Sequence, residues 1–600
     1  MPTVPTPPSS EPATDPWTPI LAPLTRQLAE LLAAPGAAPD EAQVANLLTS
    51  EGTDEWDVAI PLHRFAKQHA VAPPVLAARL APTFPSVPGI GRAFATGPYL
   101  NFTVDRSWLT RTMLDLVRAR GATYGHGPAR SERACVEHTS ANPTGPFHIG
   151  RIRNALIGDT FSRVLRAAGY PVTTHYYVDD LGRQAAIITW IWSKPISDWP
   201  VEVRQSVDGV DPTSEKPDHY LGRPYPPLNE YLKSHPEADL EVQRLTHSIE
   251  TGHAPPEHRA TVQKVLDGML QSLSALGIRF DRFVWESELL TDGSVADVVE
   301  RLARSPRATR EENGALAIDA KGAGLPQDSE KIIVTRADGT TLYATRDVAY
   351  HLQKFRGFDR VIDVLGSNHQ LHAKVLGVLL GEVGESRRPE LVLYQYITAA
   401  GGGGMSTRKG TAVHLDDLLD EAVLRAHEEI LKRRSDLTLE EREAISSSVA
   451  SGAIRFHIVR IAADKTVGFR WEDAISFEGR TGPFVQYSYA RASSILRKAE
   501  QPEPPASFDP ALLTTKEEWA LVRTLSRLPG LVDYVARTSH VHALAGYAYE
   551  LAEEFNRFYQ EVPVMKADAE RASRLALVHA FRQVLGNTLD LLGIDRLDRM

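Results

Sequence analysis

The sequence predicts a multidomain α/β protein, with a Rossmann-like parallel-sheet domain in the middle, an N-terminal α+β domain and a C-terminal all-α bundle. Residues 132–436 alternate short apolar runs with helical patterns, as parallel α/β sheets do. Residues 17–131 are mixed and end in a strand-like run at 98–104. From 437 to 600 the pattern is helical almost throughout, with apolar stripes along one face of each helix.

Two stretches differ from these three units. Residues 1–16 are rich in proline, serine and threonine, so we expect a disordered tail. Residues 192–262 are polar and rich in proline, histidine and aspartate. We interpret this second stretch as an insertion into the central domain.

The composition is that of a globular protein in a reducing compartment. Of 600 residues, 42% are hydrophobic and 24% are charged, which excludes wholesale disorder. The single cysteine, Cys135, excludes an intramolecular disulfide and a multi-cysteine zinc site. No run approaches the ~20 apolar residues of a membrane span, and the N-terminus lacks the pattern of a signal peptide. We therefore expect a cytoplasmic protein that is not attached to a membrane.

The net charge of −10 lies entirely before residue 431. An overall negative charge argues against indiscriminate binding of nucleic acid. We expect any polyanionic partner to be bound by local basic patches.

A strand, a loop, a helix and a second strand follow one another in the central domain. The strand 134–138 leads into the loop 140–146, which is rich in structure-breaking residues. A helix is predicted from about 149 to 168, and the next strand covers 172–178. Ligands of parallel sheets bind outside the carboxyl ends of the strands. The loop before the helix is therefore where we expect the chemistry.

This loop places His148 and Gly150 at a helix N-terminus. The free N–H groups and the positive end of the helix dipole favour phosphate there. We expect His148 to donate a hydrogen bond to the α-phosphate of a nucleotide, and Gly150 to let the nucleotide approach closely. An incidental helix start with a surface histidine is the alternative for this motif taken alone.

A second motif lies about 255 residues downstream, at 401–410, after the apolar strand 391–397. Four glycines precede Met405, Ser406, Arg408 and Lys409. A flexible hinge followed by cations makes a flap suited to gripping a leaving pyrophosphate.

Together the two motifs resemble the His-Ile-Gly-His and Lys-Met-Ser-Lys signatures of class I aminoacyl-tRNA synthetases. Further motifs resemble the arginyl-tRNA synthetases in particular, in the same order along the chain. They lie at 97–102, 140–146, 342–348, 405–410, 484–491 and 591–594.

The resemblance implies a two-step ligase. Arginine and ATP form arginyl-adenylate and pyrophosphate, with Mg²⁺ on the phosphates, and the arginyl group then passes to the 3′ end of tRNA. Members of this family need bound tRNA before they form the adenylate. The C-terminal bundle is then the anticodon-binding domain, and residues 17–131 contact the tRNA elbow. We expect a monomer whose partners are L-arginine and the tRNA for arginine.

The substrate side chain is a guanidinium, which favours carboxylates in bidentate geometry. Asp347 follows Tyr343 by four residues, so both lie on one face of the helix predicted there. By resemblance, the arginine-binding residues are Glu137, Asn142, Tyr343, Asp347 and His369.

The resemblance also assigns three further groups of residues. The catalytic residues are His148, Arg151, Arg408 and Lys409. The ATP-binding residues are His148, Gly150, His369, Met405 and Ser406. The tRNA-binding residues are Gln486, Tyr487, Tyr489 and Arg491, where an aromatic ring could stack on a base. Packing of these tyrosines between helices, and a purely structural role for His369, are the alternatives. No protein ligand for a metal is expected.

The chain departs from the signatures at three positions. Arg151 replaces the second histidine of the first signature, and Gly404 and Thr407 replace the two lysines of the second. We hypothesise that Arg151, together with Arg153, supplies a cation to the ATP phosphates. The departures leave two rival readings: a catalytically inactive paralogue that binds RNA, and a class I enzyme for another amino acid.

Overall fold

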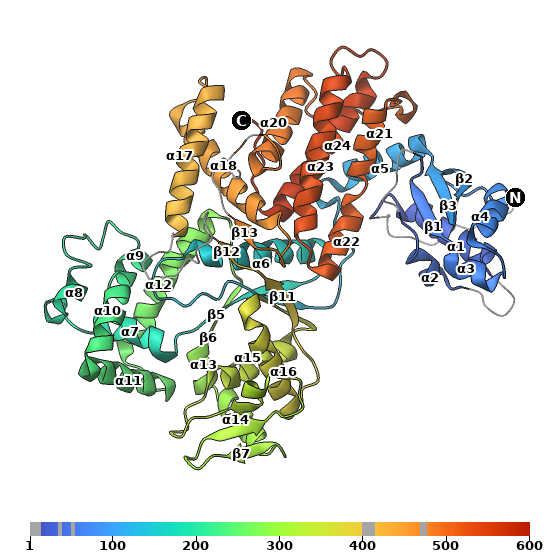
Figure 1. Cartoon of the computed structure of the whole chain (residues 1–600). Coiled ribbons are helices and arrows are strands. Elements are labelled where there is room, and N and C mark those ends of the chain that lie inside the picture. Colours follow the sequence, from blue (N-terminus) through green and yellow to red (C-terminus); the bar gives the residue numbers. More distant parts are fainter. Residues whose placement is uncertain (1–13, 34–38, 50–54, 399–413, 469–475, 477) are drawn as a thin grey trace, which may run out of the picture.

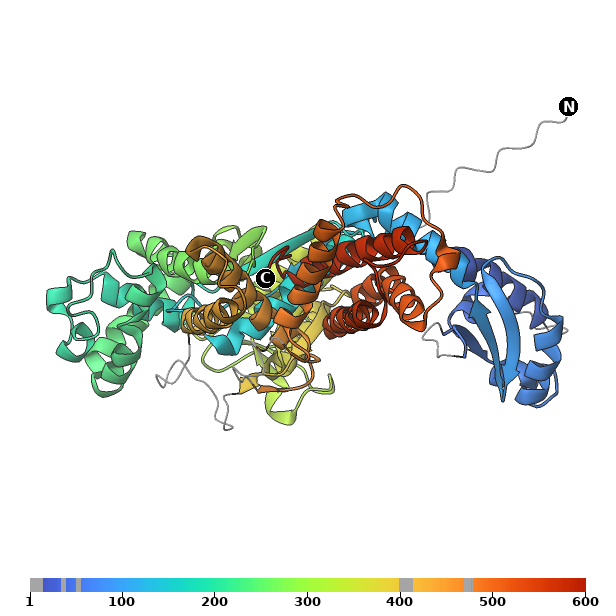
Figure 2. The ribbon, with the colours of Figure 1, turned by 90° about the horizontal axis from the view of Figure 1, so that it is seen from above.

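The computed structural model describes residues 14–33, 39–49, 55–398, 414–468, 476 and 478–600. The molecule is elongated, with the N-terminal unit at one end, a group of helices at the other, and the central sheet and C-terminal bundle between them (Figures 1 and 2). The expected tail lies outside the described residues as far as residue 13. At its end, Asp15 accepts a hydrogen bond of 2.9 Å from the amide of Trp17.

The N-terminal unit is a three-stranded antiparallel sheet, in the order β1-β3-β2, with helices beside it. The strand expected at 98–104 is β3, the middle strand. Its elements, with η marking 3₁₀ helices, are α1 (Thr18–Leu31), α2 (Glu41–Ala45), β1 (Val58–Pro61), α3 (His63–Gln68), α4 (Pro73–Leu80), η1 (Ala81–Thr83), β2 (Ile90–Thr96), β3 (Tyr99–Val104), α5 (Arg106–Arg120) and η2 (Gly121–Thr123).

The central sheet has five parallel strands, which confirms the predicted fold class. Its order is β11 (Glu390–Tyr394), β10 (Arg360–Gly366), β4 (Ala134–Glu137), β5 (Val172–Val178) and β6 (Arg282–Trp285). The predicted helix is α6 (Ile149–Ala167), which crosses from β4 to β5. Because β4 pairs with β10 in register, Glu137 lies opposite Asp363. The pairing of these strands therefore places two acidic side chains next to each other, one at the end of β4 and one in the middle of β10.

Helix α6 packs closely on the sheet and is buried along nearly its whole length. A Cβ at Gly158 would lie 2.3 Å from Cβ of His138, so glycine is required where the helix crosses the end of β4. Asp159, one residue on, forms a buried ion pair with Arg455 of the C-terminal bundle. The helix that begins with the signature is thus bonded to the bundle as well as packed on the sheet.

The polar stretch at 192–262 folds into helices that share a small apolar core with α7 (Gly182–Trp192). Its many prolines are compatible with helices, because α9, α10 and α11 each have a proline in the first turn, where no backbone N–H is needed. Its elements are η3 (Ile196–Asp198), α8 (Val201–Arg204), α9 (Pro217–Gly222), α10 (Tyr225–Ser234) and α11 (Pro236–Glu250), and α12 (Pro256–Ala275) returns the chain to the sheet.

The chain segment that follows β6 and precedes β11 forms helices and a small antiparallel sheet, whose strand order is β7-β8-β9. Helix α15 begins at Tyr343, where the sequence predicted a helix start. The elements of this layer are α13 (Glu286–Thr291), α14 (Ser294–Ala303), β7 (Ala308–Arg310), β8 (Leu316–Asp319), η4 (Gln327–Ser329), β9 (Lys331–Ile333), α15 (Tyr343–Gly357), η5 (Ser367–His369) and α16 (Gln370–Glu382).

The C-terminal part is a helical bundle that packs against α6 (Figure 1). Gly593 ends its last helix in the left-handed conformation, and a Cβ there would lie 2.2 Å from the buried Arg455 guanidinium. Its elements are β12 (Ile397–Thr398), α17 (Leu415–Arg433), α18 (Leu439–Val459), β13 (Val467–Gly468), α20 (Gly482–Lys498), η7 (Pro510–Leu512), α21 (Lys516–Leu525), α22 (Leu528–Thr538), α23 (His542–Glu561) and α24 (Arg571–Leu592). No helix in the described part of the chain is long and apolar enough to cross a membrane.

Candidate active site

The signature loop ends in a histidine that caps α6. Nδ1 of His148 accepts a hydrogen bond of 3.1 Å from the amide of Gly150. Burial, together with the charge of Arg151, lowers the pKa of His148 to about 4. The ring is therefore neutral near pH 7, and since Nδ1 accepts, the ring proton is on Nε2. That N–H is available as a hydrogen-bond donor.

Besides its expected role of letting a nucleotide approach closely, the glycine at position 150 leaves room for the ring of His148. A Cβ there would lie 2.8 Å from the ring of His148, so a larger residue would push the capping ring away. The glycine thus keeps the histidine in its capping position.

The loop before the helix has a strained backbone. Thr139 and Ser140 adopt positive φ angles of 71° and 38°. Asn154 accepts a 2.7 Å hydrogen bond from the Thr139 amide, and Ser140 Oγ lies 3.2 Å from Oε1 of Glu137. Strained backbone of this kind persists only where neighbouring groups hold it, and it is concentrated at functional sites.

A cavity of about 480 Å³ opens between this loop and the ends of β10 and β11. It brings together six of the residues that the sequence singled out. They are Glu137, Asn142, His148, Gly150, Arg151 and His369. Val364, Leu365, Tyr394 and Tyr396 add apolar and aromatic surface.

Arg151 is the half-buried cation of this cavity. Within the described residues, the structure records no hydrogen bond or ion pair from its guanidinium. It also lines a second cavity of about 400 Å³, between the signature loop and the α9–α10 region. The guanidinium is thus available to a ligand of either cavity.

The expectation that Arg153 shares this role is wrong. Arg153 is fully buried, and its guanidinium donates to the carbonyl oxygens of four residues on other segments. These acceptors are Gln395, Ile461, Ala462 and Lys465. Arg153 is therefore a structural cross-link between α6 and the chain after β11 and α18.

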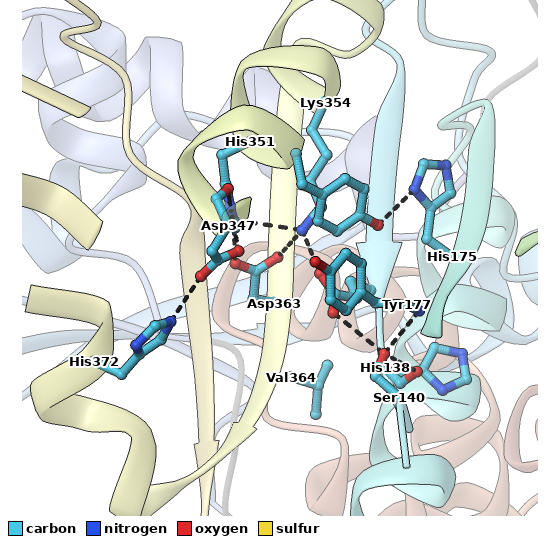
Figure 3. A network of polar contacts seen from close by, with 12 residues as sticks. His138, Ser140, His175, Tyr177, Asp347, His351, Lys354, Asp363, Val364 and His372 are labelled. Carbon is cyan, nitrogen blue, oxygen red and sulfur yellow. Dashed lines mark hydrogen bonds and ion pairs between the residues drawn. The ribbon is translucent and has the colours of Figure 1, made fainter. Parts of the chain in front are cut away.

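Asp347, expected to bind the guanidinium of arginine, is held between two histidines (Figure 3). Its Oδ1 lies 3.0 Å from Nδ1 of His351, and its Oδ2 lies 2.8 Å from Nε2 of His372. Burial opposes ionisation of the carboxyl group, but the two imidazoles hold the pKa of Asp347 well below its usual range. The carboxylate is therefore ionised across the physiological range.

Behind Asp347 lies a buried network of alternating charge. Lys354 is fully buried and forms ion pairs with Glu137 and with Asp363, the latter at 2.8 Å. Nε2 of His351 lies 2.8 Å from Oδ2 of Asp363. Burial and Lys354 oppose protonation of His351, yet the carboxylates of Asp363 and Asp347 raise its pKa to about 10.

In the other carboxyl groups of the network, burial likewise raises the pKa and the neighbouring cations lower it. Burial would raise the pKa of Asp363, but Lys354 and His351 lower it to about 2. Burial raises the pKa of Glu137 above its ordinary value, against the lowering by Lys354. Lys354 and His351 therefore remain cations and Asp363 an anion near neutral pH.

Asn142 extends this polar surface toward the second cavity. Its Nδ2 donates to Asp179 Oδ2 at 2.9 Å and to Gln184 Oε1 at 3.0 Å. Burial and the neighbouring Glu286 raise the pKa of Asp179 well above its usual range. Asn142 is thereby held with its amide oxygen free to accept from a ligand.

The two remaining arginine-pocket candidates lie near the same place. Tyr343 is 64% exposed, and its ring centroid is 5.3 Å from that of His372. His369 lies on the first cavity, where burial and the charges of His372 and Arg151 lower its pKa. Met405, Ser406, Arg408 and Lys409 lie outside the described residues.

The segment that follows the flap contacts the signature directly. His414 forms a β-bridge with His148, and the amide of Leu415 donates to the carbonyl of Phe147 at 2.7 Å. The first described residues after 413 therefore lie beside the signature histidine.

Two of the four expected tRNA contacts are buried, which argues against direct contact with RNA. Gln486 is fully buried and donates to the carbonyls of Ser448 and Asp595. Tyr489 is 4% exposed. Tyr487 is 36% exposed, and Arg491 lies 4.9 Å from the centroid of its ring. Of the four expected tRNA contacts, only Tyr487 and Arg491 are accessible to a ligand.

Six polar residues of the site were not predicted from the sequence: His351, Lys354, Asp363, His372, Asp179 and Gln184. A signal was present for Asp179, because it directly follows the strand predicted at 172–178, at its carboxyl end.

Comparisons with known proteins agree with this geometry. The model for the class I tRNA synthetase (R) catalytic domain matches residues 116–466, and the DALR anticodon binding domain matches 485–600. The arginine–tRNA ligase of Methanocella arvoryzae is 39% identical over 542 residues, covering 90% of this chain and 92% of that protein. That of Methanothermobacter thermautotrophicus is 42% identical over 500 residues, covering 83% and 85%.

A solved structure extends the likeness to the fold of nearly the whole chain. The arginyl-tRNA synthetase of Thermus thermophilus superposes with a TM-score of 0.80 at 28% identity, covering 96% of this chain and 99% of that one. The catalytic-domain match alone spans more than half of the 600 residues. The chain belongs to the arginyl-tRNA synthetase family of the class I aminoacyl-tRNA synthetases.

Proposed function

We propose that this protein joins L-arginine to its tRNA in two steps, through arginyl-adenylate, and that the residues of the two cavities divide the work as follows. The observation that carries the proposal is the carboxylate of Asp347, which contacts His351 and His372. Through His351, Asp363 and Lys354 it is joined to Glu137 in the wall of the signature-loop cavity. A guanidinium needs such a carboxylate, and the adjacent cavity has room for a nucleotide.

The signature loop binds ATP. The Nε2–H group of His148 donates to an α-phosphate oxygen, and the free guanidinium of Arg151 faces the phosphates. Gly150 and the aromatic residues of the cavity wall accommodate the adenosine. The flap residues Met405, Ser406, Arg408 and Lys409 grip the pyrophosphate as it leaves.

Mg²⁺ arrives with the nucleotide, bound to its phosphate oxygens. The polar groups that face the phosphates are N–H donors, and Glu137, the carboxylate among the described cavity residues, is already paired with Lys354. We therefore assign the ion no protein ligand and treat MgATP as the substrate.

The arginine side chain binds at Asp347, with Glu137 on the same charged surface. Tyr343 covers the guanidinium, and the amide oxygen of Asn142 accepts from the α-amino group. Asp347 discriminates against neutral side chains, because a neutral side chain in the place of His372 would leave the accessible carboxylate oxygen without a positively charged partner.

Catalysis then rests on positioning and electrostatics. A carboxylate oxygen of arginine attacks the α-phosphorus of ATP while the bond to the bridging oxygen of pyrophosphate breaks. A hydroxyl oxygen of the tRNA 3′-terminal ribose next attacks the arginyl carbonyl carbon, and AMP leaves. Neither step needs a nucleophile from the protein.

The tRNA is bound by the two ends of the chain. We assign the anticodon to the C-terminal bundle, over residues 437–600, with Tyr487 stacking on a base and Arg491 meeting phosphate. The N-terminal unit, residues 17–131, contacts the elbow, and the central unit covers 132–436. The proposed protein is a cytoplasmic monomer.

Charging of total tRNA with radiolabelled arginine tests this function. The wild type should charge tRNA in the presence of ATP and Mg²⁺. Asp347→Asn should lower kcat/KM for arginine by about 30-fold or more, because it removes the charge from a buried pair. Asp338→Asn, on an exposed turn, is the control. A wild type that binds tRNA but does not charge it would favour the binding-only paralogue.

A further inference from the structure

His372 is the group of the arginine pocket that the family assignment leaves without a role. Its Nε2 lies 2.8 Å from Oδ2 of Asp347, the oxygen that does not contact His351. The two histidines differ in exposure: the side chain of His351 is 2% exposed, whereas that of His372 is 23% exposed. His372 is therefore on the accessible side of the carboxylate (Figure 3).

The two histidines also differ in how firmly they are held. Both ring nitrogens of His351 face carboxylates, Asp347 on one side and Asp363 on the other. This ring is a fixed, buried cation. The bond recorded from the ring of His372 is the one to Asp347, beside the exposed ring of Tyr343.

The Asp347 carboxylate has a histidine at each of its two oxygens. The charge of His351 is shared with Asp363, which contacts its other ring nitrogen. A protonated His372 gives Asp347 a positively charged partner of its own on the accessible side. Burying a charge without a partner is costly, so the empty pocket favours the proton on His372.

A bound arginine supplies the same charge at the same carboxylate. Its guanidinium is always protonated and needs the Asp347 oxygen that His372 holds. With both cations present, two positive charges would compete for one carboxylate oxygen. The histidine proton and the substrate guanidinium therefore exclude each other.

We propose that His372 is a substitute for the substrate: protonated in the empty pocket, it holds Asp347 in place, and it gives up that carboxylate and its proton to solvent when arginine binds. It is a positioning residue that acts through Asp347. This inference rests on the proposed function and adds a pH-dependent selection step to it.

The groups around His372 determine the expected pH range. Burial lowers the affinity of the ring for a proton, but Asp347 raises the pKa of His372 above its ordinary value. Asp363 from β10 acts in the same direction and His351 from α15 in the opposite one. With pKa values of about 10 and about 2, His351 and Asp363 keep their charges between pH 6 and 8.5. His369, at the start of the same helix, has a lowered pKa.

The wild-type KM for arginine should therefore fall between pH 6.0 and 8.5. A competing proton with a pKa above 6.5 predicts a decrease of about fourfold or more. The KM for ATP should not follow this curve. Calorimetry of L-arginine binding, repeated in buffers of different ionisation enthalpy, should report the release of up to one proton per arginine near pH 7.

His372→Gln keeps a hydrogen-bond donor for Asp347 but cannot titrate. In this variant the pH dependence of KM and the release of protons should both disappear, and His372→Asn serves if the glutamine variant does not fold. The control is His253→Gln, which removes an exposed histidine outside the pocket and should still release protons.

Persistence of proton release in a folded His372→Gln protein would overturn the proposal. So would a wild-type enzyme that charges tRNA with arginine but releases no proton on binding it. Failure of the wild type to bind or charge arginine at all is a different result, because it would refute the proposed function itself.

Discussion

Replacing Arg151 by alanine tests how this chain works without the second signature histidine. The guanidinium lines both cavities of the site, and within the described residues it has no recorded hydrogen bond or ion pair. Its charge is therefore free to act on a ligand. We expect Arg151→Ala to slow adenylate formation and to leave the stability of the protein unchanged.

The size of the effect follows from charge and exposure. A cation and a phosphate oxygen ~4 Å apart attract by about 4 kcal/mol at the effective dielectric constant typical near a protein surface. Arg151 is half-buried, so water reduces this value, and about 2 to 3 kcal/mol remains. The rate of adenylate formation should then fall by about 30- to 150-fold.

The assay is ATP–pyrophosphate exchange in the presence of tRNA, with kcat and the KM for arginine measured separately. The loss should lie in kcat, because the developing phosphate charge is greatest in the transition state. Arg151→Lys keeps the charge and should recover part of the rate. Unchanged exchange in Arg151→Ala, with a normal melting temperature, would refute the reasoning.

Three further predictions follow from buried groups. Arg153→Met should destabilise the protein by about 3 kcal/mol or more, seen as a lower denaturation midpoint, because it leaves buried carbonyls without donors; a normal midpoint would contradict the cross-link. Arg455→Met should cost about 3 kcal/mol, because it removes the buried partner of Asp159, which keeps Arg163, and leaves the carbonyls of Leu592 and Leu276 without their donor. Additivity with Asp159→Leu in a double-mutant cycle would argue against the pairing of Arg455 with Asp159. His351 has a folded pKa of about 10 against about 6.5 unfolded. Its stabilisation is full below pH 6.5 and is lost as the pH rises toward 10, so denaturation midpoints of the wild type should fall over this range and those of His351→Gln should fall less.

The elements that could be predicted are those with local signals. The second strand of the βαβ unit was expected at 172–178 and is β5, and α6 ends within one residue of the prediction. A glycine in the left-handed conformation at 169 follows the end of that helix. Helix caps and strands of this kind depend on residues that are neighbours in the sequence, so they can be predicted from the sequence alone.

The errors share a different cause. Arg151 and Arg153 look equivalent in the sequence, but two residues along a helix correspond to about 200° of rotation, so they cannot face the same ligand. Gln486 looked available to RNA, yet it packs against Gly452 and the C-terminal residues, whose position no local pattern reveals. His372, on α16, contacts Asp347, on α15. In each case the partner is distant in sequence, and only the folded chain brings it close.

The two buried arginines make α6 the mechanical link between the bundle and the site. Arg153 bonds this helix to the segment after α18, and Asp159 bonds it to Arg455 on α18 itself. The same helix begins with the signature histidine. Interiors are packed at crystal density, so a displacement of the bundle is passed on rather than absorbed. We therefore expect a tRNA that displaces the bundle to displace the N-terminus of α6 as well, where ATP is proposed to bind. These two bonds offer a physical route for the need for bound tRNA that the family resemblance implies.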